Sequence, residues 1–207
     1  MSCPHPTALP ELGATAMLRY SRHLLLDAWG FEAQQAIAGK TALILGLGGL
    51  GCAAAQALAS AGVGHLVLVD GDAVELSNLQ RQILHDMDSL GQAKVDSAQR
   101  RLAAINPDIA YTTVAQRLDA AGLQAAVAQA DVVLDCSDNF ATRHAINRAC
   151  VAARKPLVSG AAVRFDGQVS VFDLRLDACP CYHCLFPEAE DVEEVRCAVM
   201  GVFAPVT

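Results

Sequence analysis

The chain has 207 residues and a net charge of −7, and apolar residues make up 53% of it. This length allows one α/β domain with a substantial core, and the acidic charge without a large basic cluster argues against nucleic acid as a partner. No run of 18 apolar residues could span a membrane, and the N-terminus lacks the pattern of a secretory signal, so we expect a cytoplasmic protein.

The N-terminal part begins with residues 1–16, which are rich in proline and small side chains and are expected to form a flexible arm. A single domain should occupy residues 17–207. Arg19 and Arg22 lie three residues apart, so they would share one face if residues 17–26 formed a helix. Residues 31–38 are predicted to be helical.

The stretch 41–51 is the central feature of the sequence. Five apolar or β-branched residues, 41–45, predict a buried strand, and Gly46, Gly48 and Gly51 follow in G-x-G-x-x-G spacing before an alanine-rich helix over 52–59. Such a turn lets the backbone approach a phosphate, and the helix start offers unpaired N–H groups to an anion. A second strand, 65–70, ends in Asp70, where dinucleotide folds carry a ribose-binding carboxylate. The alternative is a turn that only packs a helix on a sheet.

The rest of the chain alternates between predicted helices and strands. Helices are expected over 92–105, 120–130 and 140–153, and strands over 109–115, from 131 toward the acidic turn at 139, and over 156–159. This order predicts a Rossmann-like, doubly wound α/β fold with a mostly parallel sheet and helices on both faces. A further strand over 167–174 should form an antiparallel extension near the C-terminus.

Several polar side chains should meet where the parallel strands end, because ligands of open α/β sheets bind at that edge. They are Asp70, Asn78, Arg81, Lys94 and Asp138. A redox dinucleotide needs only the glycine turn and one acid. A triphosphate with Mg²⁺ also uses cations that neutralise phosphate oxygens and a carboxylate that holds the metal. Each charge could alternatively be a solvated loop residue.

These residues fall in segments that together resemble the ubiquitin-activating (E1-like) adenylyltransferase family, whose bacterial members activate the sulfur-carrier proteins of molybdopterin and thiamine synthesis. The resemblance covers roughly residues 17–205. Its matching segments are Arg-Tyr-Ser-Arg at 19–22, Gly-Leu-Gly-Gly-Leu-Gly at 46–51, Ser-Ala-Gly-Val-Gly at 60–64, Leu-Ser-Asn-Leu-Gln-Arg-Gln at 76–82, Gly-Gln-Ala-Lys at 91–94, Ile-Asn-Pro at 105–107, Asp-Cys-Ser-Asp-Asn at 135–139 and Val-Ser-Gly-Ala-Ala at 158–162. The segments at 158–164 and 167–172 look most like the molybdopterin-synthase activators, with the thiamine type second.

The resemblance implies an ATP-dependent adenylyltransferase that acts on the C-terminal Gly-Gly carboxylate of a small ubiquitin-like sulfur-carrier protein. Its ATP-binding residues would be Gly46, Gly48, Gly49, Gly51, Asp70, Asn78, Arg81 and Lys94. Asp138 would hold Mg²⁺. Arg22 would be an arginine finger that reaches the ATP of the other subunit, which makes the active unit a homodimer. Catalysis would depend on Arg22, Arg81, Lys94 and Asp138.

The cysteines near the C-terminus suggest a metal site. Eight cysteines without an export signal are expected to be thiols or metal ligands. By resemblance, Cys181 and Cys184 are the first half of a four-cysteine zinc site. The second pair of the family lies beyond Thr207, and two thiolates cannot close a structural zinc site. Cys179 and His183 could complete it; otherwise the thiols stay free, and zinc remains an open question.

Two further points follow from the resemblance. Cys197 lies where thiamine-type and eukaryotic relatives carry a reactive cysteine, although in molybdopterin-type enzymes the adenylate alone suffices and Cys197 could be a loop thiol without a role. The usual C-terminal elements of the family are expected to be missing, which puts full activity in question. The competing functions are an NAD-dependent oxidoreductase, which would leave Arg81, Lys94 and Asp138 without a role, and a nucleotide-binding relative without catalysis.

Overall fold

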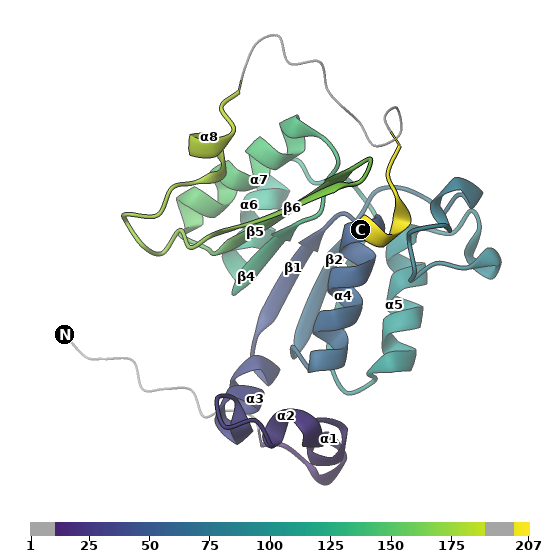
Figure 1. The fold of residues 1–207 in the computed structure, drawn as a ribbon, viewed down its shortest axis with the longest axis vertical. Coiled ribbons are helices and arrows are strands. Elements are labelled where there is room, and N and C mark those ends of the chain that lie inside the picture. The colour runs from purple at the N-terminus through teal and green to yellow at the C-terminus, as the bar shows by residue number, and fades with distance from the viewer. Residues whose placement is uncertain (1–10, 189–200) are drawn as a thin grey trace.

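A six-stranded sheet forms the centre of the computed structural model, which describes residues 11–188 and 201–207 (Figure 1). The strand order is β3-β2-β1-β4-β5-β6, and β1 to β5 run parallel while β6 pairs antiparallel with β5. The strands are β1 Thr41–Leu45, β2 His65–Val69, β3 Ala110–Val114, β4 Val132–Asp135, β5 Leu157–Val163 and β6 Asp166–Phe172. The predicted Rossmann-like fold and its antiparallel extension are confirmed.

Helices cover both faces of the sheet because the residues of the central strands alternate between two cores. Ala42 and Ile44 of β1 point to the core beneath α4 (Gly49–Ala61) and α5 (Lys94–Ile105). Leu43 and Leu45 point to the opposite core, beneath α6 (Ala120–Gln129) and α7 (Phe140–Ala153). A strand whose two faces are both buried reads as a continuous apolar run, which is the pattern seen at 41–45.

The N-terminal helices pack at the end of α4 that is remote from the glycine turn. Their bounds are α1 Ala14–Arg19, α2 Ser21–Leu24 and α3 Gly30–Ala38. Tyr20 is buried between α1 and α2; its ring lies against Gly62, which ends α4 in a left-handed conformation, and its hydroxyl accepts a hydrogen bond from Asn106 at 2.8 Å. Gln34 adds a second anchor, because its side-chain amide donates to Ala61 O at 2.8 Å.

This arrangement corrects the expectation that Arg19 and Arg22 share one helical face. Arg19 ends α1 and Arg22 lies in α2, with the non-helical Tyr20 between the two helices. Arg19 turns back to Ile105 O at 2.9 Å and pairs with Asp108 at 3.3 Å. The helix breaks because burying Tyr20 against α4 outweighs the local preference for one continuous helix. Helix α1 also begins within the segment expected to be an arm, of which residues 1–10 lie outside the described part of the chain.

Two irregular segments complete the fold. The connection between β2 and α5 contains the short turns η1 (Leu76–Asn78) and η2 (Met87–Ser89), each closed by a reciprocal capping box. After β6 come α8 (Tyr182–Leu185) and, following the residues that are not described, η3 (Ala204–Val206). Residues 201–203 pair with Arg164, and Thr207 lies over Gly49 at the start of α4. None of the described helices is both long and apolar enough to cross a bilayer.

Candidate active site

The glycine turn follows β1 at the place where the strand order reverses, between β1 and β4. Gly46 has a φ of +95°, and a Cβ added to it would lie only 2.8 Å from Cys136 O. A Cβ added to Gly51 would lie 1.8 Å from Gly46 O. Both positions therefore require glycine for the fold itself. Gly48 faces open space instead, since the nearest atom to an added Cβ is Nε2 of Gln82 at 3.9 Å.

The first turn of α4 presents its backbone to this space. Gly48 is the N-cap residue, and no side chain in the described residues caps the helix. The early N–H groups of a helix have no intrahelical acceptor, and the helix dipole adds partial positive charge there. An anion such as a phosphate would satisfy both. Gly49 is covered by Thr207, whose Cβ lies 2.8 Å from the place of an added Cβ.

Asp70 immediately follows β2 and fixes the turn. Its Oδ2 accepts a hydrogen bond from Leu47 N at 2.7 Å, and its Oδ1 accepts one from Asp72 N at 2.8 Å. An ionised carboxylate can accept about four hydrogen bonds. Asp70 thus retains acceptor capacity for the two hydroxyls of a ribose after holding Leu47 and Asp72.

The acidic loop after β4 lies directly against the glycine turn, because Cys136 contacts Gly46 and Gly51. Asp138 on this loop is exposed, and within the described residues its only side-chain hydrogen bond is with the Nδ2 of Asn139 at 3.4 Å. Asn139 is the N-cap of α7 and accepts from Thr142 N at 2.9 Å. The carboxylate of Asp138 is therefore available to bind a ligand.

Asp135, which ends β4, plays a different part from Asp138 in the loop that follows. It is 1% exposed, accepts hydrogen bonds from Ser137 Oγ at 2.6 Å and Ser159 Oγ at 3.1 Å, and lies 3.7 Å from Nη1 of Arg143. Arg143 also donates to Ser137 O. This buried network shapes the loop that carries Asp138.

The predicted residues of the β2–α5 connection lie close behind Asp70. Asn78 is buried and closes η1 by accepting from Glu75 N at 3.2 Å, so its amide holds backbone. Arg81 donates to Ser77 O at 3.1 Å with one guanidinium nitrogen. Gln82 lies in the matching segment 76–82, but the sequence assigned it no role. It is 3% exposed, lies beside Gly48, and has an Oε1 without a partner among the described residues. Its burial depends on tertiary packing, which no local pattern revealed.

Lys94 begins α5 and its ammonium is nearly buried. The Nζ of Lys94 lies 3.4 Å from Oδ2 of Asp72. The other carboxylate oxygen, Oδ1, lies 3.2 Å from Nη2 of Arg117. Partial burial works to raise the pKa of Asp72, but the bond from Arg117 and the charge of Lys94 together hold it below its ordinary value. Asp72, another residue that the sequence analysis passed over, therefore holds the side chain of Lys94 in place beside the site.

A buried set of groups supports the turn from below. His85 Nε2 lies 3.2 Å from Leu47 O, and its Nδ1 lies 3.0 Å from Ser97 Oγ. Burial lowers the pKa of His85 and raises the pKa of the neighbouring Cys52 to about 12. A neutral imidazole beside a protonated thiol is not an activated nucleophile. The group positions Leu47 and leaves no reactive centre.

Among the residues predicted to bind ATP or act on it, Arg22 lies apart from the others. It lies in α2, at the opposite end of α4 from the glycine turn, and α4 has 13 residues. A helix of that length spans roughly 20 Å. Arg22 is exposed, and its side chain forms no hydrogen bond or ion pair within the described part of the chain. It therefore cannot reach the turn of its own chain without rearrangement.

The cysteine cluster lies away from the nucleotide site. Cys181 Sγ and Cys184 Sγ are 3.6 Å apart, and Cys179 lines the same cavity. Thiolates around a tetrahedral zinc ion lie roughly 3.8 Å apart, so the pair fits half of such a site. Although partial burial acts to raise it, hydrogen bonds from Asn147 and the turn around Cys184 hold the pKa of Cys181 below its usual range. Cys197 lies outside the described residues.

Within the described residues, one edge of the sheet combines the uncapped start of a helix, a carboxylate suited to a ribose, a buried amide oxygen without a partner, a nearly buried ammonium and an exposed acid. This set suits a nucleoside triphosphate better than a redox dinucleotide, which has no use for Lys94 and Asp138.

Comparisons with known proteins agree with this chemistry. Residues 20–207 match the model of the ThiF family. The chain is 51% identical over 201 residues to the molybdopterin-synthase adenylyltransferase of Escherichia coli K12, covering 96% of this chain and 79% of that protein. It is 49% identical over 189 residues to the sulfur carrier protein ThiS adenylyltransferase of the same organism, covering 91% and 74%. A crystal structure of E. coli MccB with ATP superposes with a TM-score of 0.68 at 29% identity, covering 80% of this chain and 51% of that one.

Proposed function

The chain belongs to the ThiF family, and we propose that it is an ATP-dependent adenylyltransferase that activates the C-terminal carboxylate of a small ubiquitin-like sulfur-carrier protein ending in Gly-Gly. The observation that carries this proposal is the meeting of the glycine turn, Asp70, Lys94 and the Asp138 loop at one sheet edge. The carrier of molybdopterin synthase is favoured, because the relative with that function has the higher identity of the two bacterial types.

ATP binding follows from the geometry of the turn. The phosphates approach the open space over Gly48 and the first N–H groups of α4, and Asp70 accepts from the ribose hydroxyls. Lys94 supplies a fixed positive charge, and Arg81 has guanidinium nitrogens left for phosphate oxygens after its bond to Ser77 O. Gln82 points its Nε2 toward Gly48, where this N–H donor can bind a phosphate oxygen.

The reaction needs no general base. A C-terminal carboxylate has a pKa of about 3.5 and is ionised at neutral pH. One of its oxygens forms a bond to the α-phosphorus of ATP while the bond from that phosphorus to the pyrophosphate oxygen breaks, which yields the acyl-adenylate and pyrophosphate without moving a proton. The barrier is the approach of one anion to another, and the cations of the site lower it.

Asp138 is the residue proposed to hold Mg²⁺. The fit rests on its exposed carboxylate, which the fold leaves with a single weak contact to Asn139. Magnesium prefers one or two carboxylates together with substrate phosphates. When bound, the ion would neutralise phosphate charge. Zinc is proposed at Cys181 and Cys184, where the sulfur separation fits two of its ligands.

We further propose a homodimer in which Arg22 serves the partner's site. The distance of Arg22 from its own glycine turn supports action across an interface. The N-terminal helices and the turn between α2 and α3 also expose large apolar side chains that an interface would bury. These are Met17, Leu18, Leu25, Leu26 and Phe31.

The test mixes the full chain with Mg²⁺, ATP and one carrier at a time: the molybdopterin-synthase carrier, ThiS, and each of them without its terminal Gly-Gly. We expect pyrophosphate release and an adenylate mass on an intact carrier only, fastest with the molybdopterin-synthase carrier. ATP binding without pyrophosphate release would identify a non-catalytic relative, and binding of NAD in place of ATP would identify an oxidoreductase. Faster turnover of ThiS would reassign the pathway and keep the reaction.

A further inference from the structure

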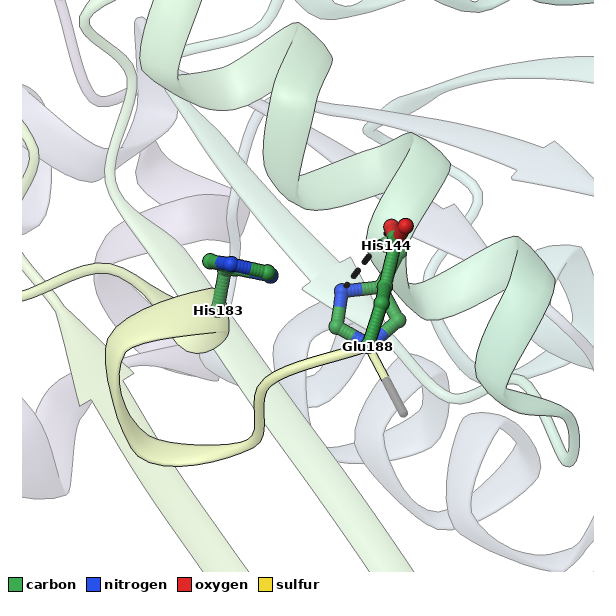
Figure 2. Close-up of side chains that lie close together, drawn as sticks. All are labelled: His144, His183 and Glu188. Atoms are coloured by element: carbon green, nitrogen blue, oxygen red, sulfur yellow. Dashed lines mark ion pairs between the residues drawn. The ribbon is translucent and has the colours of Figure 1, made fainter. Parts of the chain in front are cut away.

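A second group of potential metal ligands lies away from the nucleotide site, between α7 and the segment that follows α8. His144, His183 and Glu188 each offer one ligand atom, and these atoms all lie within 4.8 Å of one another (Figure 2). The Nδ1 of His144 is 3.5 Å from Oε1 of Glu188. Ligand atoms around a tetrahedral zinc ion with N and O ligands lie roughly 3.4 Å apart. The first pair already has this spacing, and His183 is exposed and free to adjust.

The fold fixes the position of the buried member of this group. His144 lies on α7 with its side chain 5% exposed, and its ring contacts those of Tyr182 and His183 at centroid distances of 5.3 and 5.6 Å. One turn further along α7, Asn147 Oδ1 accepts a hydrogen bond from Tyr182 N at 3.0 Å. Helix α8 is therefore docked on α7, which holds His183 beside His144.

The group is separate from the cysteine pair, although His183 lies between Cys181 and Cys184 in the sequence. The cavity lined by Cys179, Cys181 and Cys184 is completed by residues of α7 and of the β6–α8 connection. Neither histidine lines it, and neither does Glu188. A metal ion held by thiolates would occupy that cavity and leave the imidazoles free.

Arg148 competes for the same carboxylate. Its Nη1 donates to Oε1 of Glu188 at 2.5 Å, so the guanidinium occupies the carboxylate oxygen that a metal ion would bind. The Arg148 side chain is 63% exposed, whereas His144 is buried. The arginine can move into solvent at little cost and leave the carboxylate to a cation of higher charge.

We propose that His144, His183 and Glu188 form a binding site for a divalent transition-metal ion of the zinc class, distinct from the cysteine site. Two imidazoles and one carboxylate leave a fourth position open to water. Imidazole ligands favour Zn²⁺, Co²⁺ or Ni²⁺ over Mg²⁺ and Ca²⁺, which prefer oxygen. Bound metal would tie α8 to α7 and raise the unfolding temperature. The proposal does not depend on the adenylyltransferase function.

The test uses Co²⁺ and the full chain with Cys179, Cys181 and Cys184 replaced by serine, in a buffer with excess Mg²⁺. We expect one Co²⁺ per chain with a visible spectrum that lacks a sulfur-to-cobalt band. His183→Ala and Glu188→Gln change exposed side chains, and each should weaken binding at least about tenfold, since even outer-shell partners of metal ligands contribute 10–100-fold. Arg148→Ala should strengthen binding. The control is His65→Ala, because His65 bonds Thr112 on another part of the sheet.

The proposal is wrong if the serine variant takes up no Co²⁺, or if His183→Ala and Glu188→Gln leave its uptake unchanged. Should the serine variant not fold, the unsubstituted chain serves instead, with Co²⁺ bound to saturation. In that case, His183→Ala should remove only the absorption of Co²⁺ bound by nitrogen and oxygen ligands. The sulfur-to-cobalt bands should remain. The site would also be ruled out if the unsubstituted chain and its His183→Ala variant bound the same amount of Co²⁺ with the same spectrum.

Discussion

Leu47 N donates a hydrogen bond of 2.7 Å to Oδ2 of Asp70, which joins the middle of the glycine turn to the end of β2. The carbonyl of the same residue is held by His85 at 3.2 Å. Both backbone groups of Leu47 are thus fixed by side chains from the β2 side of the sheet. The turn is preorganised before any nucleotide arrives, so little ordering remains to oppose binding.

Gly48 and Gly51 should respond differently to substitution. Gly48→Val places a branched side chain in open space over the turn, so the fold should persist while ATP binding is lost. Gly51→Ala should unfold or strongly destabilise the chain, because its Cβ would lie 1.8 Å from Gly46 O. Calorimetric titration with ATP and thermal unfolding separate the two outcomes. Equal ATP affinity in wild type and Gly48→Val would remove the turn from the binding site.

Gln82→Met should make the protein more stable and a weaker ATP binder. The change keeps the side-chain length but removes a buried oxygen without a partner in the described residues, which costs about 1–3 kcal/mol when left unsatisfied. Each kcal/mol regained should raise the unfolding temperature by about 2–4 °C in a domain of this size. A variant that is stabilised and binds ATP normally would show that Gln82 has no ligand.

Asp138→Asn should lower carrier-dependent ATP–pyrophosphate exchange by about 10²–10³, because it removes the charge proposed to hold Mg²⁺ and keeps the shape. ATP affinity should fall less, since Lys94 and the turn remain. Asp166→Asn, at an exposed position on β6, is the matched control. Asp135→Asn is unsuitable as a control because its buried partner Arg143 would lose a counter-charge, and we expect it to unfold more easily. Normal exchange in Asp138→Asn at ordinary Mg²⁺ would refute the metal assignment.

Arg22→Ala and Asp138→Ala should each be inactive alone and active when mixed. In a mixed dimer one site combines an intact Asp138 with an intact Arg22 from the neighbour. Random exchange at equal amounts should restore about a quarter of wild-type activity, since half of the dimers are mixed and each has one working site. Exchange is verified with a mass-tagged subunit. No recovery despite proven exchange would mean that Arg22 does not act across the interface.

The free energy of unfolding should fall as the pH drops below about 6.5. Burial lowers the pKa of His85 in the folded state, with a smaller opposing effect of the Leu47 carbonyl, so the unfolded chain binds more protons in this range. The stability contributed by neutral His85 is present above the unfolded pKa and is lost as the pH falls through the folded pKa. His85→Gln should show a shallower slope in urea titrations between pH 7 and 5. His144 adds to the same slope, because burial lowers its pKa too.

Much of the fold could be predicted because its signals are local. The strand over 41–45 and the helix over 140–153 have the predicted bounds, and the expected strand over 167–174 appears as β6. The helix predicted from residue 52 begins at Gly49. The low helix propensity of glycine led the prediction to start the helix too late. The expected strand over 156–159 extends to Val163, since pairing with β6 continues it.

The site could be predicted only where one residue type carries the chemistry alone. The glycine spacing and Asp70 predict a nucleotide, the charges of Lys94 and Asp138 near the strand ends favour a triphosphate, and the family resemblance adds the role of Arg22. The burial of Gln82 and the ion pair of Lys94 with Asp72 depend on how the β2–α5 connection folds over α4, which leaves no periodic pattern. The meeting of His144 with His183 and Glu188 depends on the docking of α8, so it is visible only in three dimensions.

The pairing of β1 with β4 sets when this site can exist during folding. Ala42 lies opposite Val132, although the two strands belong to different halves of the chain. Closing so long a loop is slow compared with forming helices and contacts between neighbouring segments. The glycine turn and Asp70 come from the first half, whereas the loop with Asp138 follows β4. A refolding chain can therefore complete its candidate active site only after its two halves have joined.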